Sequence, residues 1–261
     1  MLQIKPLNEH ISYFNVPYKD IFTTVAVVRS ENGSILFDAA FKESDIEDYI
    51  MPALAQLGVD DLKYIFISHN HGDHAGGLQW LLPKLPHCTV ISCSSKLAEA
   101  YPAYQFVNPR DGEVFLEHFQ AVTIPGHTAD CAALLDKRTG TLISGDCLQV
   151  YGIYGSGTWG AVIRLIEPHL QAHKKLHTLD INTILAAHDY HPYGQIAQGK
   201  NAVKAYLEGC VEALARIRDV LKDNLSRTDE EVTALCNDGK LPTVPVGVVT
   251  AIRAALKEGC F

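Results

Sequence analysis

The sequence lacks the features of membrane-spanning and nucleic-acid-binding proteins. It has no run of about 18 consecutive apolar residues, the length that a helix needs to cross a bilayer. Basic residues are also in deficit, because 22 Lys and Arg stand against 30 Asp and Glu and give a formal net charge of -8 at pH 7. Nucleic acid and anionic membrane surfaces attract positively charged proteins, so we expect neither as a partner.

Paired cysteines and an export signal are missing as well. The seven cysteines are odd in number, and none belongs to a CxxC pair. We therefore expect reduced thiols, most of them acting as small buried hydrophobes. Residues 1–11 contain no apolar segment of the kind found in secretory signal peptides. These absences together predict a cytoplasmic protein.

The 261 residues, 47% of them hydrophobic, are enough for one α/β domain with a small appendage. Runs of β-branched and aromatic residues predict strands at 11–14, 23–28, 34–37, 64–67, 89–91, 119–123, 132–135, 141–143 and 183–186. Apolar periodicity predicts helices at 44–57, 75–82 and 161–179, and then a helical remainder from about residue 197. Ser44 and Glu47 have the spacing of a capping box at the start of the first helix. This mixture predicts sheets covered by helices.

Three histidines and an aspartate fall within six residues, directly after the apolar strand at 64–67. They lie in the segment Ser68-His69-Asn70-His71-Gly72-Asp73-His74. Imidazole and carboxylate are the ligands that zinc and similar divalent ions prefer. A surface loop that merely contains histidine is the alternative, but the chain has 12 histidines in all, and chance does not readily place three of them together.

Three further candidate ligands each follow an apolar strand, namely His127, Asp146 and His188. Strand ends from distant parts of the chain can in this way deliver ligands to one rigid site. A carboxylate between two cations screens their repulsion, which favours a bridging role for an aspartate such as Asp146. Cys147 beside Asp146 and His191 beyond His188 are the alternative ligands at these two places.

These segments also resemble a known family. His69-x-His71-x-Asp73-His74, followed by Ala75-Gly76-Gly77, resembles the HxHxDH signature of the metallo-β-lactamase superfamily. Pro125-Gly126-His127-Thr128, Ser144-Gly145-Asp146 and Ala187-His188-Asp189 resemble its later motifs in the same order, and Leu36-Phe37-Asp38 resembles its early strand-plus-Asp element. The resemblance covers roughly residues 34 to 189. It implies an α/β fold, a four-layer αββα sandwich, with a catalytic core at 1–196 and a helical C-terminal region at 197–261 that packs on the core.

The resemblance implies how two divalent metal ions would be held. His69, His71 and His127 would hold the first ion, Asp73, His74 and His188 the second, and Asp146 would bridge them. Zinc is the metal that we expect, although the same ligands accept iron or manganese. Asp38 is a candidate hydrogen-bond partner for a ligating imidazole.

A dinuclear metal-dependent hydrolase is the function that follows from this resemblance. Metal-bound hydroxide would cleave a small ester, thioester or lactone, as in glyoxalase II-like and lactonase-like relatives, and Asp73 would orient the hydroxide or carry its proton. A glycine-rich segment at 149–160 is a candidate substrate loop or, equally, a structural connection. The candidate substrate-binding residues are Tyr151, Tyr154, Trp159 and Tyr190.

Other functions remain open at this stage. Gly126-His127-Thr128-x-x-Cys131 and Ala187-His188-Asp189-Tyr190 are similar to segments of iron-dependent persulfide dioxygenases, and flavodiiron proteins and phosphodiesterases are further relatives. A metal-binding protein without catalysis is a fourth interpretation. His169, His173 and His177 recur every four residues, which predicts a packed helix face more strongly than another metal site. The apolar faces of the C-terminal helices permit a homodimer or an intramolecular cap, and a small molecule is the expected substrate.

Overall fold

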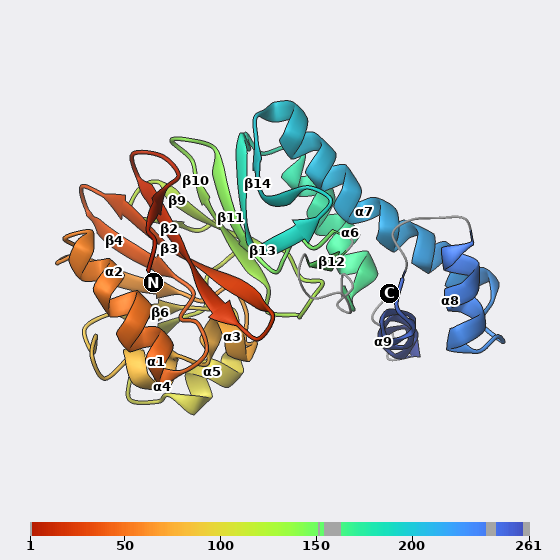
Figure 1. Cartoon of the computed structure of the whole chain (residues 1–261), viewed down its shortest axis with the longest axis horizontal. Coiled ribbons are helices and arrows are strands. Elements are labelled where there is room, and N and C mark those ends of the chain that lie inside the picture. Colours follow the sequence, from red (N-terminus) through yellow and green to blue (C-terminus); the bar gives the residue numbers. More distant parts are fainter. Residues whose placement is uncertain (1, 151, 154–162, 239–243, 258–261) are drawn as a thin grey trace.

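Two seven-stranded sheets lie face to face in the computed structural model, and helices cover their outer faces (Figure 1). The structure describes residues 2–150, 152–153, 163–238 and 244–257. The strands of the first sheet follow one another in chain order. They are β1 (Lys5–Pro6), β2 (Ile11–Tyr18), β3 (Ile21–Ser30), β4 (Gly33–Phe37), β5 (Leu62–Phe66), β6 (Thr89–Ile91) and β7 (Phe106–Val107).

The second sheet has the strand order β12-β13-β11-β10-β9-β8, and β14 pairs with β13. Its strands are β8 (Val114–Phe115), β9 (Phe119–Thr123), β10 (Ala132–Asp136), β11 (Thr141–Gly145), β12 (Gly152–Ile153), β13 (Thr183–His191) and β14 (Gly194–Gln198). Parallel pairing joins β4 to β5, β5 to β6, β6 to β7 and β11 to β13. The carboxyl ends of β5 and β11 are therefore free to present loops from each sheet.

Alternating side chains of one strand fill two different cores. On β3, Val25 and Val27 belong to the core beneath the outer helices, whereas Ala26 and Val28 belong to the core between the sheets. All four are fully buried. Because successive side chains of a strand point to opposite faces, a sheet that is covered on both sides needs such a continuous apolar run.

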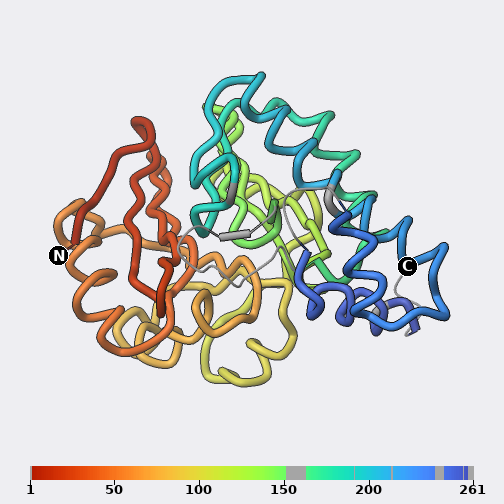
Figure 2. The backbone as a smooth tube through the Cα atoms, turned by 45° about the vertical axis from the view of Figure 1, so that its right-hand side comes forward, coloured from red at the N-terminus to blue at the C-terminus, as the bar shows by residue number. Residues whose placement is uncertain are grey.

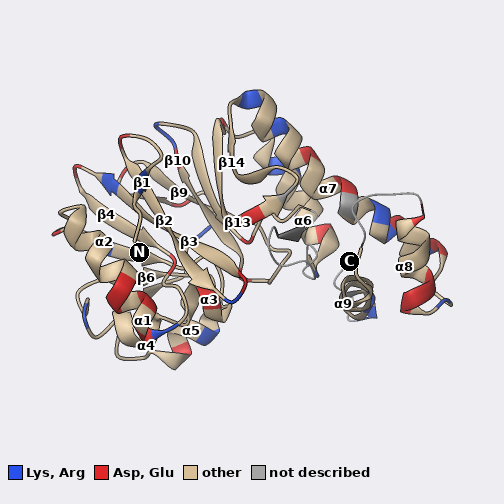
Figure 3. Ribbon diagram, viewed as in Figure 1, with Lys and Arg blue, Asp and Glu red and all other residues tan. Residues whose placement is uncertain are grey.

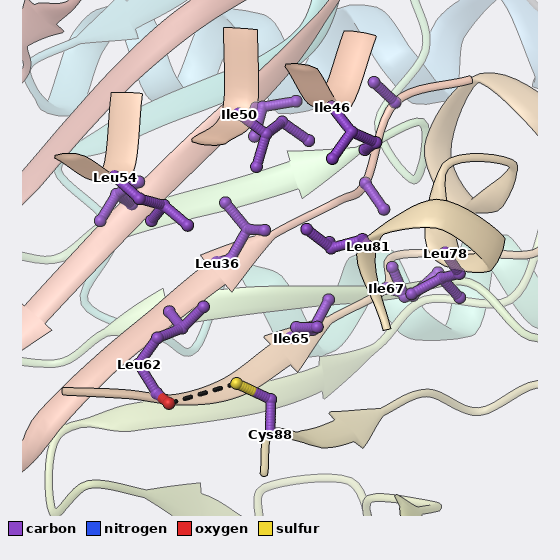
Figure 4. Close-up of a cluster of buried hydrophobic side chains, with 14 of the residues drawn as sticks. Leu36, Ile46, Ile50, Leu54, Leu62, Ile65, Ile67, Leu78, Leu81 and Cys88 are labelled. Atoms are coloured by element: carbon purple, nitrogen blue, oxygen red, sulfur yellow. Dashed lines mark hydrogen bonds between the residues drawn. The ribbon is translucent and has the colours of Figure 1, made fainter. Parts of the chain in front are cut away.

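Helices cover the outer face of the first sheet. A continuous helical segment runs through α1 (Glu43–Asp45), a π-helical turn η1 (Ile46–Ile50) and α2 (Met51–Gln56), and α3 (Gly72–Ala75), α4 (Leu78–Leu81) and α5 (Ser95–Ala100) follow. Figure 4 shows Ile46, Ile50 and Leu54 of this segment above Leu36 and Ile65 of the sheet. Ser44 does not begin the helix as predicted, because the carboxylate of Asp45 accepts the backbone N–H groups of Phe41 and Lys42 instead.

The second sheet is covered by α6 (Ile166–Leu176) and α7 (Lys200–Asp223), and α8 (Asp229–Asn237) and α9 (Val246–Lys257) complete the chain. Figure 2 shows these C-terminal helices on the side of the molecule opposite the N-terminal strands. They share one apolar cluster, in which Ile166 of α6 packs with Ile217 of α7, Val232 of α8 and Ile252 of α9. The predicted four-layer αββα arrangement with a C-terminal helical extension is confirmed.

The described part of the chain contains no helix that is both long and apolar enough to span a bilayer. Its six cysteines are free, and five of them are buried. In the view of Figure 3, Lys and Arg are interspersed with Asp and Glu on the helices and loops.

Candidate metal centre

The candidate ligands meet where the two sheets adjoin. The segment after β5, a loop followed by α3, carries His69 to His74, the loop after β9 carries His127, and Asp146 directly follows β11. His188 lies within β13, which continues to His191, rather than after a shorter strand as the sequence predicts. Two hydrogen bonds join β13 to β3 of the other sheet: the Thr24 hydroxyl donates to the carbonyl of Ala187, and Nδ1 of His188 donates to the carbonyl of Phe22 at 2.5 Å.

Three imidazoles form the first group of the centre. Ligand nitrogens of His69, His71 and His127 all lie within 4.8 Å of one another. Nε2 of His127 is 2.9 Å from Nδ1 of His71, so the two rings turn these atoms toward one point. Such a set of three imidazoles suits a tetrahedral divalent ion with one position left for water or substrate.

A carboxylate and two imidazoles form the second group. Ligand atoms of Asp73, His74 and His188 also lie within 4.8 Å of one another. Oδ2 of Asp73 is 3.4 Å from Nε2 of His74 and 3.6 Å from Nε2 of His188. This group therefore offers one carboxylate and two imidazoles as donors to a second ion.

Asp146 lies between the two groups and turns one carboxylate oxygen to each. Its Oδ2 is 3.5 Å from Nε2 of His127 and 4.0 Å from Nε2 of His69. Its Oδ1 is 3.1 Å from Nε2 of His188 and 3.6 Å from Nε2 of His74. A carboxylate with this placement can bridge two cations and offset their repulsion.

The chemistry of these donors fits bound metal ions. Nε2 of His69 and Nε2 of His74 are buried and have no hydrogen-bond partner among the described residues. A buried polar atom without a partner is costly, and a metal ion in each group would satisfy the nitrogen of that group. Nδ1 of His74 lies 2.6 Å from Oδ2 of Asp38, which accepts its proton and so leaves the lone pair on Nε2 for a ligand.

Asp38 holds the start of the segment that carries His69 to His74. Its carboxylate accepts the backbone N–H of Ser68 at 2.8 Å and the Ser68 hydroxyl at 2.9 Å, and it is completely buried. The backbone of Asp38 is left-handed, with φ 63°, as is that of Ala40, with φ 54°. Non-glycine residues adopt this conformation at a cost, which persists only where surrounding contacts hold it, as they do beside this loop.

Two close approaches require glycine next to the ligands. Gly145, which precedes Asp146, has φ 52°, and a Cβ at this position would lie 2.5 Å from Cβ of Ser68. Gly126, which precedes His127, packs against the ring of His169, where a Cβ would lie 2.4 Å from Nδ1. Side chains at these positions would push the ligand loops apart, so the two glycines set their spacing.

Burial and neighbouring charges lower the pKa of some imidazoles in the centre and raise the pKa of others. Burial lowers the pKa of His69 and that of His71, and the positive charges of neighbouring imidazoles lower both further. Burial also opposes protonation of His74, but Asp73, Asp38 and Asp146 raise the pKa of His74 well above its usual value. Against burial, the imidazoles of His74 and His188 hold the pKa of Asp73 down to about 2. The centre thus combines ionised carboxylates with neutral imidazoles in the first group, which is the state that ligation requires.

Comparison with known families identifies this arrangement. The family profile described as "Metallo-beta-lactamase superfamily" matches residues 18–188. The chain belongs to this superfamily. The match begins in β2 and ends at His188, so it includes every candidate ligand.

Relatives in the superfamily carry several different names. "Uncharacterized protein YobT" of Bacillus subtilis is 31% identical over 147 residues, which are 48% of this chain and 62% of that protein. "Beta-lactamase-like protein 2 homolog" of Caenorhabditis elegans is 25% identical over 84% of this chain and 72% of its own length. A hydroxyacylglutathione hydrolase of Nostoc is 30% identical over 54% of this chain and 55% of its own length. Two of these three matches span less than two thirds of the relative.

Solved structures in the superfamily share the fold. A metallo-beta-lactamase family protein from Thermus thermophilus has a TM-score of 0.65 at 18% identity and covers 97% of this chain and 95% of its own. A flavo di-iron protein from Thermotoga maritima has a TM-score of 0.65 at 17% identity, with coverage of 87% and 69%. These likenesses establish the four-layer architecture.

Of the four predicted substrate residues, the structure describes Tyr190 alone. Tyr151, Tyr154 and Trp159 lie outside the described residues. Tyr190 is buried, and its hydroxyl donates to Oδ1 of Asp146 at 2.9 Å, so it contacts a candidate ligand. Cys147, the alternative ligand, is completely buried, and burial raises the pKa of its thiol well above the usual value, which disfavours the thiolate that a metal needs.

Two residues that no sequence pattern connects with the ligands also contact them. The hydroxyl of Thr23, on β3, donates to Oδ2 of Asp73 at 3.0 Å. Nε2 of Gln149 lies 3.1 Å from Nδ1 of His127 and donates to Oδ2 of Asp146 at 3.4 Å. Thr23 belongs to no motif, and Gln149 is marked only as the first residue of the candidate substrate loop at 149–160.

Proposed function

We propose that this protein is a dinuclear metal-dependent hydrolase that cleaves a small ester, thioester or lactone. The observation that carries the proposal is the convergence of seven donors around two buried, unpartnered imidazole nitrogens, those of His69 and His74. Membership of the metallo-β-lactamase superfamily supports hydrolysis, and one relative is named a hydroxyacylglutathione hydrolase. We propose zinc as the metal and a cytoplasmic location.

The protein's own side chains have separate tasks in this reaction. A pair of bound divalent ions would supply Lewis acidity and lower the pKa of water in the site. Asp73 is ionised at neutral pH, because its pKa is about 2, and the Thr23 hydroxyl fixes the orientation of its carboxylate. Asp73 can therefore orient an attacking water through a hydrogen bond. Asp146 balances positive charge between the two groups, and Tyr190 holds it in place.

The test combines metal analysis with a panel of substrates. Protein purified and reconstituted with zinc should bind about two equivalents per chain, as a dinuclear centre requires, and should hydrolyse at least one of an aryl ester, a thioester and a lactone. Asp146→Asn keeps the size of the side chain but removes the bridging charge. It should lose one equivalent of zinc and reduce kcat/KM at least about a hundredfold, as loss of a central catalytic charge does.

Asp189→Asn is the matched control, because Asp189 neighbours His188 on β13 but is not one of the candidate ligands. It should retain both zinc ions and full activity. A protein that binds a single iron and consumes oxygen with a persulfide, without hydrolysing any of the three substrates, would instead be an oxidoreductase, and the proposal would be wrong.

A further inference from the structure

A cavity of about 730 Å³ opens beside the first group of imidazoles. His71 and His127 form part of its wall, so a molecule in this cavity contacts the metal centre directly. The volume is within the range of pockets that enclose whole small-molecule ligands, and is much larger than a single carbonyl group needs. The cavity therefore has room for a part of the substrate that does not react.

Two cationic side chains, Lys96 and Arg164, line this cavity. Lys96 lies on α5, which follows β6 of the first sheet, whereas Arg164 precedes α6, which covers the second sheet. Neither side chain has an ion-pair partner within the part of the chain that the structure describes, and both are exposed. Two unpaired cations that converge on a cavity from different sheets are free to bind an anion.

The backbone ties Arg164 to the metal centre. Its N–H and that of Leu165 both donate to the carbonyl of Gly126, at 2.8 and 3.0 Å. Gly126 directly precedes His127, so the Arg164 backbone and the ligand loop hold a fixed relation. The backbone of Arg164 is therefore held in a set position relative to the first group of imidazoles.

Among the described residues that line the cavity, the two cations outnumber the carboxylates. Asp130 is the single carboxylate among the lining residues that the structure describes, and its Oδ1 accepts the hydroxyl of Thr128. Burial, together with the charge of Asp130, raises the pKa of the Cys93 thiol to about 11, so this neighbour stays neutral. Ser94 and Ser95 add hydroxyl groups that can donate to an anion. This local balance is the reverse of the whole chain, which has a formal charge of -8.

We propose that Lys96 and Arg164 form a subsite for an anionic group, a carboxylate or a phosphate, in the non-reacting part of the substrate. The subsite rests on the proposed function, because it places the scissile bond of such a substrate at the metal centre. Arg binds carboxylate and phosphate through its planar fork, and Lys binds them as a point charge. An anionic ester or thioester is therefore preferred over a neutral one of equal reactivity.

The experiment compares two esters of one leaving group, p-nitrophenyl butyrate and p-nitrophenyl hemiglutarate, which differ by a carboxylate at the end of the same acyl chain. The zinc-loaded protein should have a KM about tenfold lower for the hemiglutarate, the gain expected of one charge-assisted hydrogen bond. Lys96→Gln and Arg164→Gln should each remove most of that gain without changing kcat or the KM for the butyrate. Added salt should also reduce the gain, because exposed charges are screened.

Lys204→Gln is the matched control, since Lys204 is an exposed lysine on α7 that pairs with Glu208 and does not line the cavity. It should behave as the unchanged protein does. Equal KM values for the two esters in the unchanged protein, or a gain that survives in both cavity variants, would overturn the subsite while leaving hydrolysis intact.

Binding without turnover separates the subsite from the proposed function. Calorimetric titration with glutarate and with inorganic phosphate should show binding that weakens about tenfold in Lys96→Gln and in Arg164→Gln. Stronger binding of glutarate assigns a carboxylate, and stronger binding of phosphate assigns a phosphate. If neither ester is hydrolysed but this binding and its loss in the variants are observed, the subsite stands and the proposed hydrolysis fails. If neither anion binds through Lys96 and Arg164, the subsite is wrong.

Discussion

Tyr190 and Asp146 form a buried pair whose effect reaches the metal centre. The Tyr190 hydroxyl donates to Oδ1 of Asp146 at 2.9 Å, the oxygen that also faces His188. Burial, and the negative charge of Asp146, raise the pKa of Tyr190 well above its usual value, so the hydroxyl keeps its proton. A donor that cannot ionise stabilises the ionised carboxylate and fixes the direction of its lone pairs.

Tyr190→Phe removes this hydroxyl without leaving a cavity. We expect the affinity for the second metal ion to fall about tenfold or more, in the range found when the hydrogen-bond partner of a ligand is lost. Competition with a chromophoric chelator measures this affinity. The KM of the preferred substrate should change little, because the hydroxyl is occupied by Asp146.

Tyr206→Phe provides the comparison for Tyr190→Phe. The Tyr206 hydroxyl is equally buried, but it donates to the carbonyl of Leu148. Its loss should lower the free energy of unfolding by about 1 kcal/mol, the usual value of one hydrogen bond, with unchanged metal affinity. Equal metal affinities in the two variants would show that Tyr190 has only a packing role.

At the scale of elements, local periodicity in the sequence predicts the core strands. It does not predict the residues by which pairing with distant strands lengthens a strand. The strand at 119–123 has its predicted bounds, and the predicted helical remainder from about residue 197 contains α7, α8 and α9. The predicted helix 161–179 is shorter, Ile166–Leu176, and the predicted strand 183–186 continues to His191 because β12 and β14 both pair with it. The short strands β1, β7, β8 and β12 have two residues each, too few for a periodic signal.

The candidate ligands can be predicted from local sequence patterns, whereas the residues that contact them cannot. Imidazoles and carboxylates that follow apolar strands stand out in the sequence, and their order matches a family pattern. Phe22 reaches His188 only because β3 and β13 of different sheets lie side by side, and Thr23 on β3 reaches Asp73 of α3, which is 50 residues away in the sequence. Such contacts depend on sheet packing and register, which no local spacing contains. The roles of the individual ligands stay predictions until metal binding is measured.

Helix α6 carries buried histidines that make the fold sensitive to acid. His169 and His173 are buried, with ring centroids 4.6 Å apart, whereas His177 is exposed where the helix ends. Burial, and the charge of His177, lower the pKa of His173 to about 4. In the unfolded chain a histidine titrates near pH 6.5, so between these values the unfolded state binds more protons than the folded state.

The free energy of unfolding should therefore fall as the pH falls from about 6.5 to about 4, by up to about 1.4 kcal/mol per pH unit for one such histidine. His173→Leu removes this titration, so the dependence should be shallower in the variant. Urea unfolding of the metal-free protein at several pH values in this range measures it. His87→Gln changes an exposed histidine and should leave the slope unaltered. An unchanged slope in His173→Leu would contradict the assignment.

At the scale of the molecule, the metal centre joins the two sheets. The first sheet supplies His69 to His74, and the second supplies His127, Asp146 and His188. An ion that binds the folded arrangement and not the unfolded chain adds RT ln(1 + [metal]/Kd) to the free energy of unfolding, or about 2.7 kcal/mol at a hundred times Kd. Bound metal therefore stabilises the contact between the halves.

Removal of metal with a chelator should lower the melting temperature, and titration with zinc should restore it in a concentration-dependent way. Thermal unfolding followed by circular dichroism measures this shift. Asp146→Asn should show a smaller shift than the unchanged protein, because it binds less metal. A melting temperature that is independent of zinc would show that no ion binds the folded state selectively.

The C-terminal helices extend the molecule beyond the sheets. Strand β14 pairs with β13 through Gln198, so contact with the sheet continues past residue 196, and α7 then leads to α8 and α9 (Figure 1). Ile166 of α6 joins the apolar cluster of these helices and attaches them to the layer that covers the second sheet. The division into a core at 1–196 and a helical region at 197–261 stays a prediction.

The donors of the centre are widely separated in the order of synthesis. His69 to His74 are synthesised early, whereas His127 follows near the middle of the 261-residue chain and His188 later still. A nascent chain thus lacks a donor of the second group until His188 has been made. If the centre binds two ions as proposed, the second site would be completed only after strands of both sheets have been synthesised, and a cell short of metal would accumulate full-length chains with empty sites.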